Sequence, residues 1–232
     1  MELPLDDLLT VGLDPSSTTF GVSLCLNGEI VRTLTIKPPS ENEYYARYRY
    51  VMDFLEQEIL PLGQGELGTW YSSAIEEPPP AQQSSALLYP YYFGCLDLFR
   101  ENDVPMTFAF AASRLKSLIL NGRKTWKGEP VTGSAKNPIR EMGAEYFGWI
   151  KLKNSHETEA SYLADLAYLF RQHLDGVSEL TIPKYKEVLC STKVIKKKRK
   201  FGKTVKTIEH TQGMRYNPNK IYFNWAEFEI IR

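Results

Sequence analysis

The chain has 232 residues and a mass of 26.6 kDa, which fits one large domain or an ordinary domain with an appendage. With 43% hydrophobic and 24% charged residues, the composition excludes an intrinsically disordered chain, which cannot form a packed core. No apolar run approaches the roughly 18 residues of a membrane span. Residues 1–7 carry acids where a secretory signal would carry Lys or Arg. We therefore expect neither a membrane span nor export.

The formal net charge of zero hides an uneven distribution. Residues 175–232 contain thirteen Lys and Arg against six Asp and Glu, so this segment carries +7 and residues 1–174 carry −7. The densest basic run is Lys196–Lys200 (KKKRK). This asymmetry predicts a body over 1–174 and a basic extension over 175–232 with an anionic partner, most often nucleic acid. The alternative is a tail that only improves solubility.

The chain has three cysteines, Cys25, Cys95 and Cys190. They are an odd number, their spacings match no zinc motif, and each lies among apolar neighbours. We interpret them as core residues of a protein in a reducing, cytoplasmic compartment.

The first elements are short apolar runs at Val11–Leu13, Phe20–Leu26 and Glu29–Ile36. Asn27-Gly28 separates the last two runs and is the two-residue turn of an antiparallel hairpin. Ser40 is a candidate N-cap for a long amphipathic helix that ends near Pro61. Two or three strands, followed by a helix, therefore open the domain.

Strands and helices then alternate. Trp70–Ile75 is predicted as a buried strand that stops at Glu76-Glu77, because the three prolines that follow cannot continue a ladder. Ser84–Arg100 is predicted as a helix interrupted or kinked near Pro90, and Met106–Ala111 as another strand.

The rest of the body begins with Arg114–Leu120, a polar and basic stretch, followed by Asn121–Lys136, which has the composition of a long functional loop. Pro138 suits the first turn of a helix that runs to about Tyr146. Ser155 is a candidate cap for a last helix that ends at His173. This order predicts an α/β domain with a largely parallel sheet, and the alternating residues of the extension predict a small β-rich appendage.

Acids at the ends of buried strands indicate where chemistry takes place, because a buried carboxylate must be paired or metal-bound. Asp14 follows Val11–Leu13 and Glu76 follows Ala74-Ile75, so both are expected at the carboxyl edge of the sheet. His156 and Glu159, three residues apart on a helix, share a face. Three carboxylates and an imidazole suit Mg²⁺ or Mn²⁺.

Each of these residues also has a structural alternative. Asp14 could cap a turn, and Glu76 could be a solvated strand end. His156 and Glu159 could be polar residues of a helix first turn, where acids are favourable near the positive end of the dipole.

The order of these motifs resembles the RuvC family of Holliday junction resolvases, within the ribonuclease H-like superfamily. Residues 12–21 (GLDPSSTTFG) look like its opening strand and turn, and 74–76 (AIE) resemble its second acidic motif. Residues 132–136 (TGSAK) resemble the segment before its penultimate helix. Residues 156–160 (HETEA) resemble its closing Asp-x-x-Asp-Ala motif, with His and Glu at the acidic positions. The resemblance covers roughly residues 9 to 173.

The resemblance implies a ribonuclease H-like fold, with a five-stranded mixed sheet of order 3-2-1-4-5 whose strand 2 is antiparallel, flanked by helices. It also implies a homodimer that cleaves branched DNA, in particular Holliday junctions, with metal ions bound by Asp14, Glu76, His156 and Glu159. Two ions about 4 Å apart would activate a water and stabilise the leaving oxygen. The apolar run Leu87–Phe99 is a candidate dimer surface, with core packing as the favoured alternative.

The candidate phosphate contacts are basic residues of the body and of the extension. They are Lys116, Arg123, Lys124, Lys127, Lys136, Lys196, Lys197, Lys198 and Arg199. Tyr91, Tyr92 and Trp126 could stack on unpaired bases, although burial is the alternative, and for the tyrosines the favoured one.

The sequence leaves two ligand positions and three functions open. Glu77 competes with Glu76, and Asp165 competes with Glu159; we favour Glu159 because its helical position also brings His156 to the site. The same acids would serve a nuclease of RNA–DNA hybrids or flaps, and a DNA-binding module that has lost cleavage is a third function. A sugar-kinase or actin-like ATPase has a similar glycine loop but needs a second lobe that this length does not provide.

Overall fold

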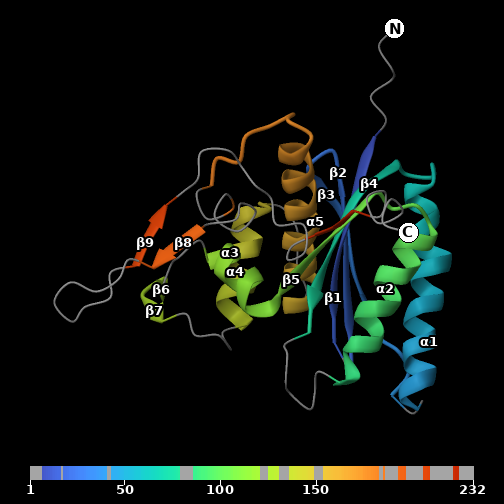
Figure 1. Ribbon diagram of the computed structural model, residues 1–232. Helices are drawn as coiled ribbons and strands as arrows, with labels where there is room; N and C mark the ends of the chain where they lie inside the picture. Colours follow the sequence, from blue (N-terminus) through green and yellow to red (C-terminus); the bar gives the residue numbers. More distant parts are fainter. Residues whose placement is uncertain are drawn as a thin grey trace, which may run out of the picture.

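The computed structural model describes 7–16, 18–40, 43–78, 86–120, 125–130, 136–148, 154–182, 185, 193–196, 206–209 and 222–224. Its centre is one mixed sheet of six strands in the order β10-β5-β4-β1-β2-β3 (Figure 1). The strands span Leu8–Pro15 (β1), Phe20–Leu26 (β2), Glu29–Ile36 (β3), Thr69–Glu77 (β4), Met106–Ala111 (β5) and Tyr222–Asn224 (β10).

Strands β1, β4 and β5 are parallel, and β2 is antiparallel to both of its neighbours. The first five strands therefore have the predicted order 3-2-1-4-5 with a reversed strand 2, which confirms the α/β, ribonuclease H-like fold. The sixth strand comes from the extension, because Tyr222 of β10 pairs antiparallel with Phe108 of β5. The division into a body over 1–174 and an extension over 175–232 remains a prediction.

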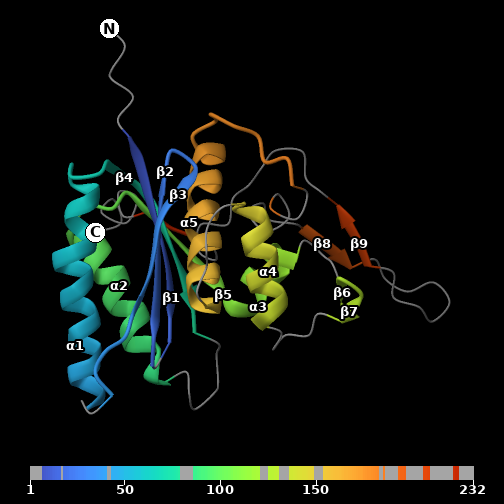
Figure 2. The same ribbon diagram turned by 180° about the vertical axis from the view of Figure 1, so that it is seen from behind.

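Helices cover both faces of the sheet. On one face lie α1 and α2, and on the other α5 crosses β1, β2 and β4, with α3 and α4 beyond it (Figures 1 and 2). These helices span Tyr44–Phe54 (α1), Tyr89–Glu101 (α2), Ala112–Leu120 (α3), Lys136–Tyr146 (α4) and Ser155–Leu174 (α5). Two short hairpins pair Thr125–Trp126 (β6) with Glu129–Pro130 (β7), and Lys193–Lys196 (β8) with Lys206–Glu209 (β9).

Side chains of β1 alternate between the two layers, as the pleat of a strand requires. Leu9, Val11 and Leu13 are fully buried in the core formed with α1 and α2. Burial of such a side chain is worth roughly 1.5–3 kcal/mol. The intervening residues, Gly12 and Asp14 among them, face α5. The core side of the strand thus fixes which residues point toward α5.

The predicted hairpin between β2 and β3 is confirmed. Asn27 and Gly28 have φ values of 52° and 90°, so both lie in the left-handed region that a two-residue turn of type I′ requires. Leu26 pairs with Glu29 directly across the turn.

Several helix limits differ from the predictions. Ser40 is not the cap of α1, because the helix begins at Tyr44, and the chain then continues through a π-helical turn, Leu55–Ile59, and a 3₁₀ turn, Leu60–Gly63. Pro90 lies in the first turn of α2 and does not kink it, since proline has no N–H to lose there.

The limits of α3 and α5 also differ. The polar and basic stretch 114–120, for which no secondary structure was predicted, belongs to the helix α3. The N-cap of α5 is Asn154 and not Ser155. Within the part of the chain that the structure describes, no helix is both long and apolar enough to span a membrane.

Candidate metal centre

Two glycines allow α5 to lie directly on the sheet. A Cβ atom on Gly12 would be 2.0 Å from the carbonyl oxygen of Ala160, and one on Gly21 would be 2.5 Å from that of His156. Both distances are far below van der Waals contact, so any side chain at either position would push the helix away. The first turns of α5 consequently lie against the ends of β1 and β2.

The start of α5 is fixed by its cap. The Asn154 side chain accepts a hydrogen bond of 2.9 Å from the backbone N–H of Glu157, which satisfies one of the free donors at a helix start. The Thr158 hydroxyl donates to the carbonyl oxygen of Asn154 at 3.1 Å. The direction in which the first-turn side chains project is therefore well defined.

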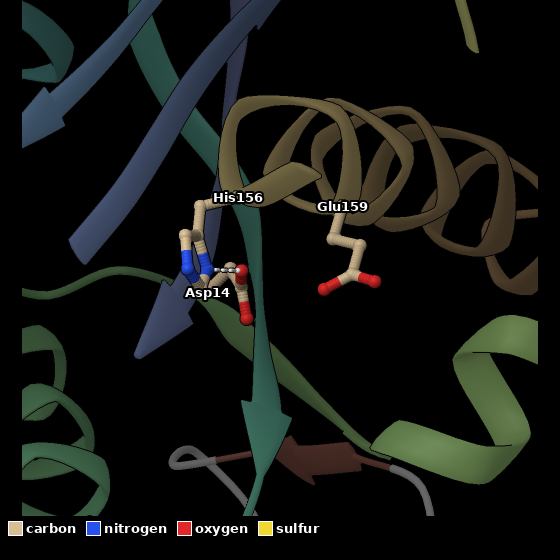
Figure 3. Close-up of side chains that lie close together, drawn as sticks. All are labelled: Asp14, His156 and Glu159. Atoms are coloured by element: carbon tan, nitrogen blue, oxygen red, sulfur yellow. Dashed lines mark hydrogen bonds and ion pairs between the residues drawn. The ribbon is translucent and has the colours of Figure 1, made fainter. Parts of the chain in front are cut away.

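His156 and Glu159 project from this turn toward Asp14 at the end of β1 (Figure 3). Ligand atoms of the three residues all lie within 4.8 Å of one another. Nδ1 of His156 is 2.5 Å from Oδ2 of Asp14. An ionised carboxylate only accepts, so the Nδ1–H of His156 donates this bond. Asp14 is buried, with only 2% of its surface exposed.

Glu76 lies beside this cluster on the neighbouring strand. The pairing of Leu13 with Ile75 in the parallel ladder puts Asp14 and Glu76 level with each other. Oε2 of Glu76 is buried and finds no hydrogen-bond partner among the described residues. Burial, reinforced by the charges of Asp14 and Glu159, raises the pKa of Glu76 well above its usual range, while the Lys116 ammonium opposes this shift.

These residues fit a divalent metal ion. A buried carboxylate oxygen without a donor is costly unless a cation or a proton compensates it, and three acids converge here with one imidazole. Oxygen ligands with one nitrogen suit Mg²⁺ or Mn²⁺. The structure therefore brings together all four predicted ligands, Asp14, Glu76, His156 and Glu159; their role as ligands remains a prediction.

The two competing acids lie elsewhere. Glu77 follows Glu76 on β4, so it points to the opposite face, where its charge raises the pKa of Tyr92 in addition to the larger effect of burial. Asp165 accepts a hydrogen bond of 3.0 Å from the Tyr146 hydroxyl, and burial raises its pKa to about 6. Neither residue belongs to the group of possible metal ligands that includes Glu159.

The predicted phosphate contacts are placed only in part. Lys116 of α3 is half-buried, and its charge acts on Glu76. The exposed ammonium of Lys127 lies 3.0 Å from Glu141 and 3.5 Å from Glu145 of α4. Five residues lie outside the described residues, and the side chains of two more, on α4 and β8, are likewise not described. The five are Arg123, Lys124, Lys197, Lys198 and Arg199, and the two are Lys136 and Lys196.

The aromatic residues of α2 are mainly core residues. Tyr91 is fully buried and Tyr92 is 5% exposed, which confirms the core packing favoured for both tyrosines over stacking on bases. The side chain of Trp126 is outside the described residues. Leu87 and Phe93 are exposed on the same segment, at 45% and 54%.

The sequence interpretation missed the residues that hold the first turn of α5 from its other side. Thr35 of β3 donates to Glu157 Oε1 at 2.9 Å, and the Asn154 amide donates to Thr35 at 2.9 Å. Asn154 with Glu157 three residues later has the spacing of a capping box, which was a usable signal for the helix start. No sequence pattern pointed to Thr35.

Comparison with solved structures identifies the fold. Thermus thermophilus RuvC in complex with a Holliday junction substrate matches with a TM-score of 0.51 and 14% identity, over 74% of this chain and 98% of that one. This chain has a RuvC-like fold. A second structure of Thermus thermophilus RuvC matches with a TM-score of 0.49 and 16% identity, over 68% of this chain and 90% of that one. No family model matches the sequence, and no curated protein matches it.

Proposed function

We propose that this RuvC-like chain is a metal-dependent endonuclease that hydrolyses phosphodiester bonds in branched DNA, and that its substrate is the Holliday junction. The observation that carries the proposal is the convergence of Asp14, His156 and Glu159 within 4.8 Å at the carboxyl ends of the central strands. Glu76, with a buried oxygen that lacks a donor among the described residues, adds a fourth ligand.

In this proposal Asp14, Glu76, Glu159 and His156 hold Mg²⁺ or Mn²⁺, with two ions at each site. Bound ions of this kind generate a nucleophile from water and stabilise the leaving oxygen. The hydrogen bond from His156 Nδ1 to Asp14 orients both side chains. Metal ligation or proton transfer by His156 would then use its other ring nitrogen, Nε2.

Phosphate binding is assigned to the basic residues around this centre and in the extension. Lys116 lies close enough to act on the Glu76 carboxylate, so it is suited to neutralise a phosphate held beside the acids. From Lys193 to Lys206 the sequence has eight basic residues and no acid. Neutralisation of phosphates by such a segment does not depend on base sequence.

The proposed substrate and partner follow from the comparison with a structure that holds a Holliday junction substrate. We propose a homodimer, since two sites are needed to cut both related strands of a four-way junction. The exposed side chains of Leu87 and Phe93 on one segment are available for such a contact. A protein of this kind would act in DNA recombination or repair in the cytoplasm.

The deciding experiment incubates the protein with a labelled four-way junction, a flap, a linear duplex and an RNA–DNA hybrid, each in Mg²⁺, Mn²⁺ or EDTA. We expect paired nicks in the junction with either metal and no product in EDTA. Cleavage of the hybrid or the flap alone would favour the alternative nuclease. Tight junction binding with no cleavage in any metal would favour an inactive DNA-binding module.

A further inference from the structure

Asp14, Gly21 and Thr35 form one row across three adjacent strands. The register pairs Asp14 of β1 with Gly21 of β2, and Gly21 with Thr35 of β3. Residues directly opposite one another in an antiparallel pair point to the same face of the sheet. The row thus presents a carboxylate, an empty position and a hydroxyl to the first turn of α5.

The first turn of α5 contacts all three members of the row. At one end the Nδ1 atom of His156 is 2.5 Å from Asp14. In the middle the carbonyl of His156 occupies the space that a side chain at position 21 would need. At the other end Glu157 and Asn154 bond to Thr35. The turn is therefore held from both sides of Gly21.

The bonds at the Thr35 end close a ring. The Thr35 hydroxyl donates to Oε1 of Glu157, the Glu157 backbone N–H donates to Oδ1 of Asn154, and the Asn154 amide donates to the Thr35 oxygen, each at 2.9 Å. Each of the three residues donates once and accepts once in this ring. Glu157 is 2% exposed, so water does not readily replace a missing bond.

We propose that Thr35 is a positioning residue for the metal centre, which acts through Asn154 and Glu157. This inference rests on the proposed function. The Thr35 hydroxyl fixes the rotation of the first turn of α5 and its distance from the sheet. It thereby sets the distance from His156 and Glu159 to Asp14. Residues that hydrogen-bond directly to metal ligands are typically worth 10–100-fold in metal affinity or activity, and Thr35 acts one residue farther from the ligands, so its effect belongs at the lower end of this range.

The chain offers a closely matched control. The Thr10 hydroxyl of β1 also donates from the sheet to α5, at 2.9 Å to the carbonyl of Ala164. Ala164 is seven residues beyond Glu157, or about 10 Å along the helix. Thr35→Val and Thr10→Val therefore each remove a strand hydroxyl that bonds to α5, one at the first turn of the helix and the other farther along it.

The test measures Mn²⁺ binding directly, without DNA, from the electron paramagnetic resonance signal of free Mn²⁺ during titration of the full chain. Thr35→Val is expected to raise the dissociation constant by about 10-fold, and Thr35→Ser, which keeps the hydroxyl, to stay close to the wild type. Thr10→Val is expected to lower the melting temperature without changing Mn²⁺ affinity. Melting in EDTA is recorded for every variant.

A second variant breaks the same ring of hydrogen bonds without altering β3. Asn154→Ser keeps an N-cap oxygen but removes the amide that donates to Thr35, and it is expected to weaken Mn²⁺ binding in the same direction. Mn²⁺ affinity within about twofold of the wild type in folded Thr35→Val or Asn154→Ser protein would overturn the inference. If the wild type and Asp14→Asn bind Mn²⁺ equally, the proposed function fails, and the inference fails with it.

Discussion

Nδ1 of His156 lies 2.5 Å from Oδ2 of Asp14, although 142 residues separate the two in the chain. This contact joins the end of β1 to the start of α5. It exists because Gly12 and Gly21 let α5 approach the backbone of β1 and β2. The candidate metal centre therefore forms only when segments far apart in the sequence pack together.

Replacement of Asp14 by Asn should abolish cleavage while leaving junction binding within a few-fold of the wild type. The amide keeps the shape but loses the charge that holds a divalent ion, whereas affinity for DNA comes mainly from phosphate neutralisation. Cleavage assays in Mg²⁺ and gel-shift assays in EDTA test the two parts separately. Asp53→Asn, at a surface ion pair of α1, is the control. Undiminished cleavage by the Asp14 variant would exclude this metal centre.

Glu159→Gln should lower metal-dependent cleavage by at least about 100-fold, since a bound metal supplies several kcal/mol of transition-state stabilisation. Asp165→Asn, on the same helix, should keep near wild-type cleavage, because its carboxylate is held by Tyr146 away from the cluster. Single-turnover rates with saturating protein measure the effect on the chemical step. The reverse pattern would move the site along α5 and leave His156 without a function.

Asp165 should make the protein less stable as the pH rises through the window from about 4 to 6. Burial raises its pKa from 3.8 to about 6, so the folded state binds the proton more tightly than the unfolded state. Stability therefore falls as the carboxyl ionises, at a total cost of about 3 kcal/mol. The groups facing Asp165 are Tyr146, Tyr185 and Cys25, whose pKa values are all raised and which stay neutral in this window.

The corresponding variant is Asp165→Asn, whose amide oxygen can still accept from Tyr146. It should be about 1–3 kcal/mol more stable than the wild type at pH 8 and no more stable at pH 4. Urea unfolding at both pH values measures the difference, with the exposed Asp97→Asn as the control. Equal stability of the Asp165 variant and the wild type at pH 8 would contradict this prediction.

The basic run of the extension should contribute to the salt dependence of DNA binding. If Lys196, Lys197, Lys198 and Arg199 neutralise phosphates, their joint replacement by Ala should flatten the slope of log K against log[salt] by up to about 0.9 for each phosphate that is no longer neutralised. A variant that exchanges Lys for Arg and Arg for Lys at these positions keeps the charge and should keep the slope. An unchanged slope in the alanine variant would mean that the run is a solvated surface.

The order of strands and helices could be predicted because local signals agree with the final structure. The limits of β2, β3 and β5 match the predicted runs, and Asn27-Gly28 forms the expected turn, since only a few residue types adopt positive φ at both positions. The start of α1 could not be placed in the same way. Ser40 has the right side chain for a cap, but the helix begins at Tyr44.

Residues of the candidate metal centre were predictable where chemistry restricts them. A carboxylate that follows a buried strand needs a partner, which identified Asp14 and Glu76. Helical spacing favoured Glu159 over Asp165, and the structure puts Glu159 among the possible ligands and Asp165 beside Tyr146. The burial of Tyr91 and Tyr92, favoured from the sequence, is confirmed by the structure.

By itself the sequence determined the order of the elements, the hairpin turn and the acids that must be compensated, because these depend on the period and conformation of neighbouring residues. Tertiary structure alone decided that Thr35 lies in one row with Asp14, and that residues 222–224 complete the sheet beside β5. The physical reason is that cross-strand register and the position of a helix on the sheet depend on packing between segments far apart in the chain. No local pattern carries that information.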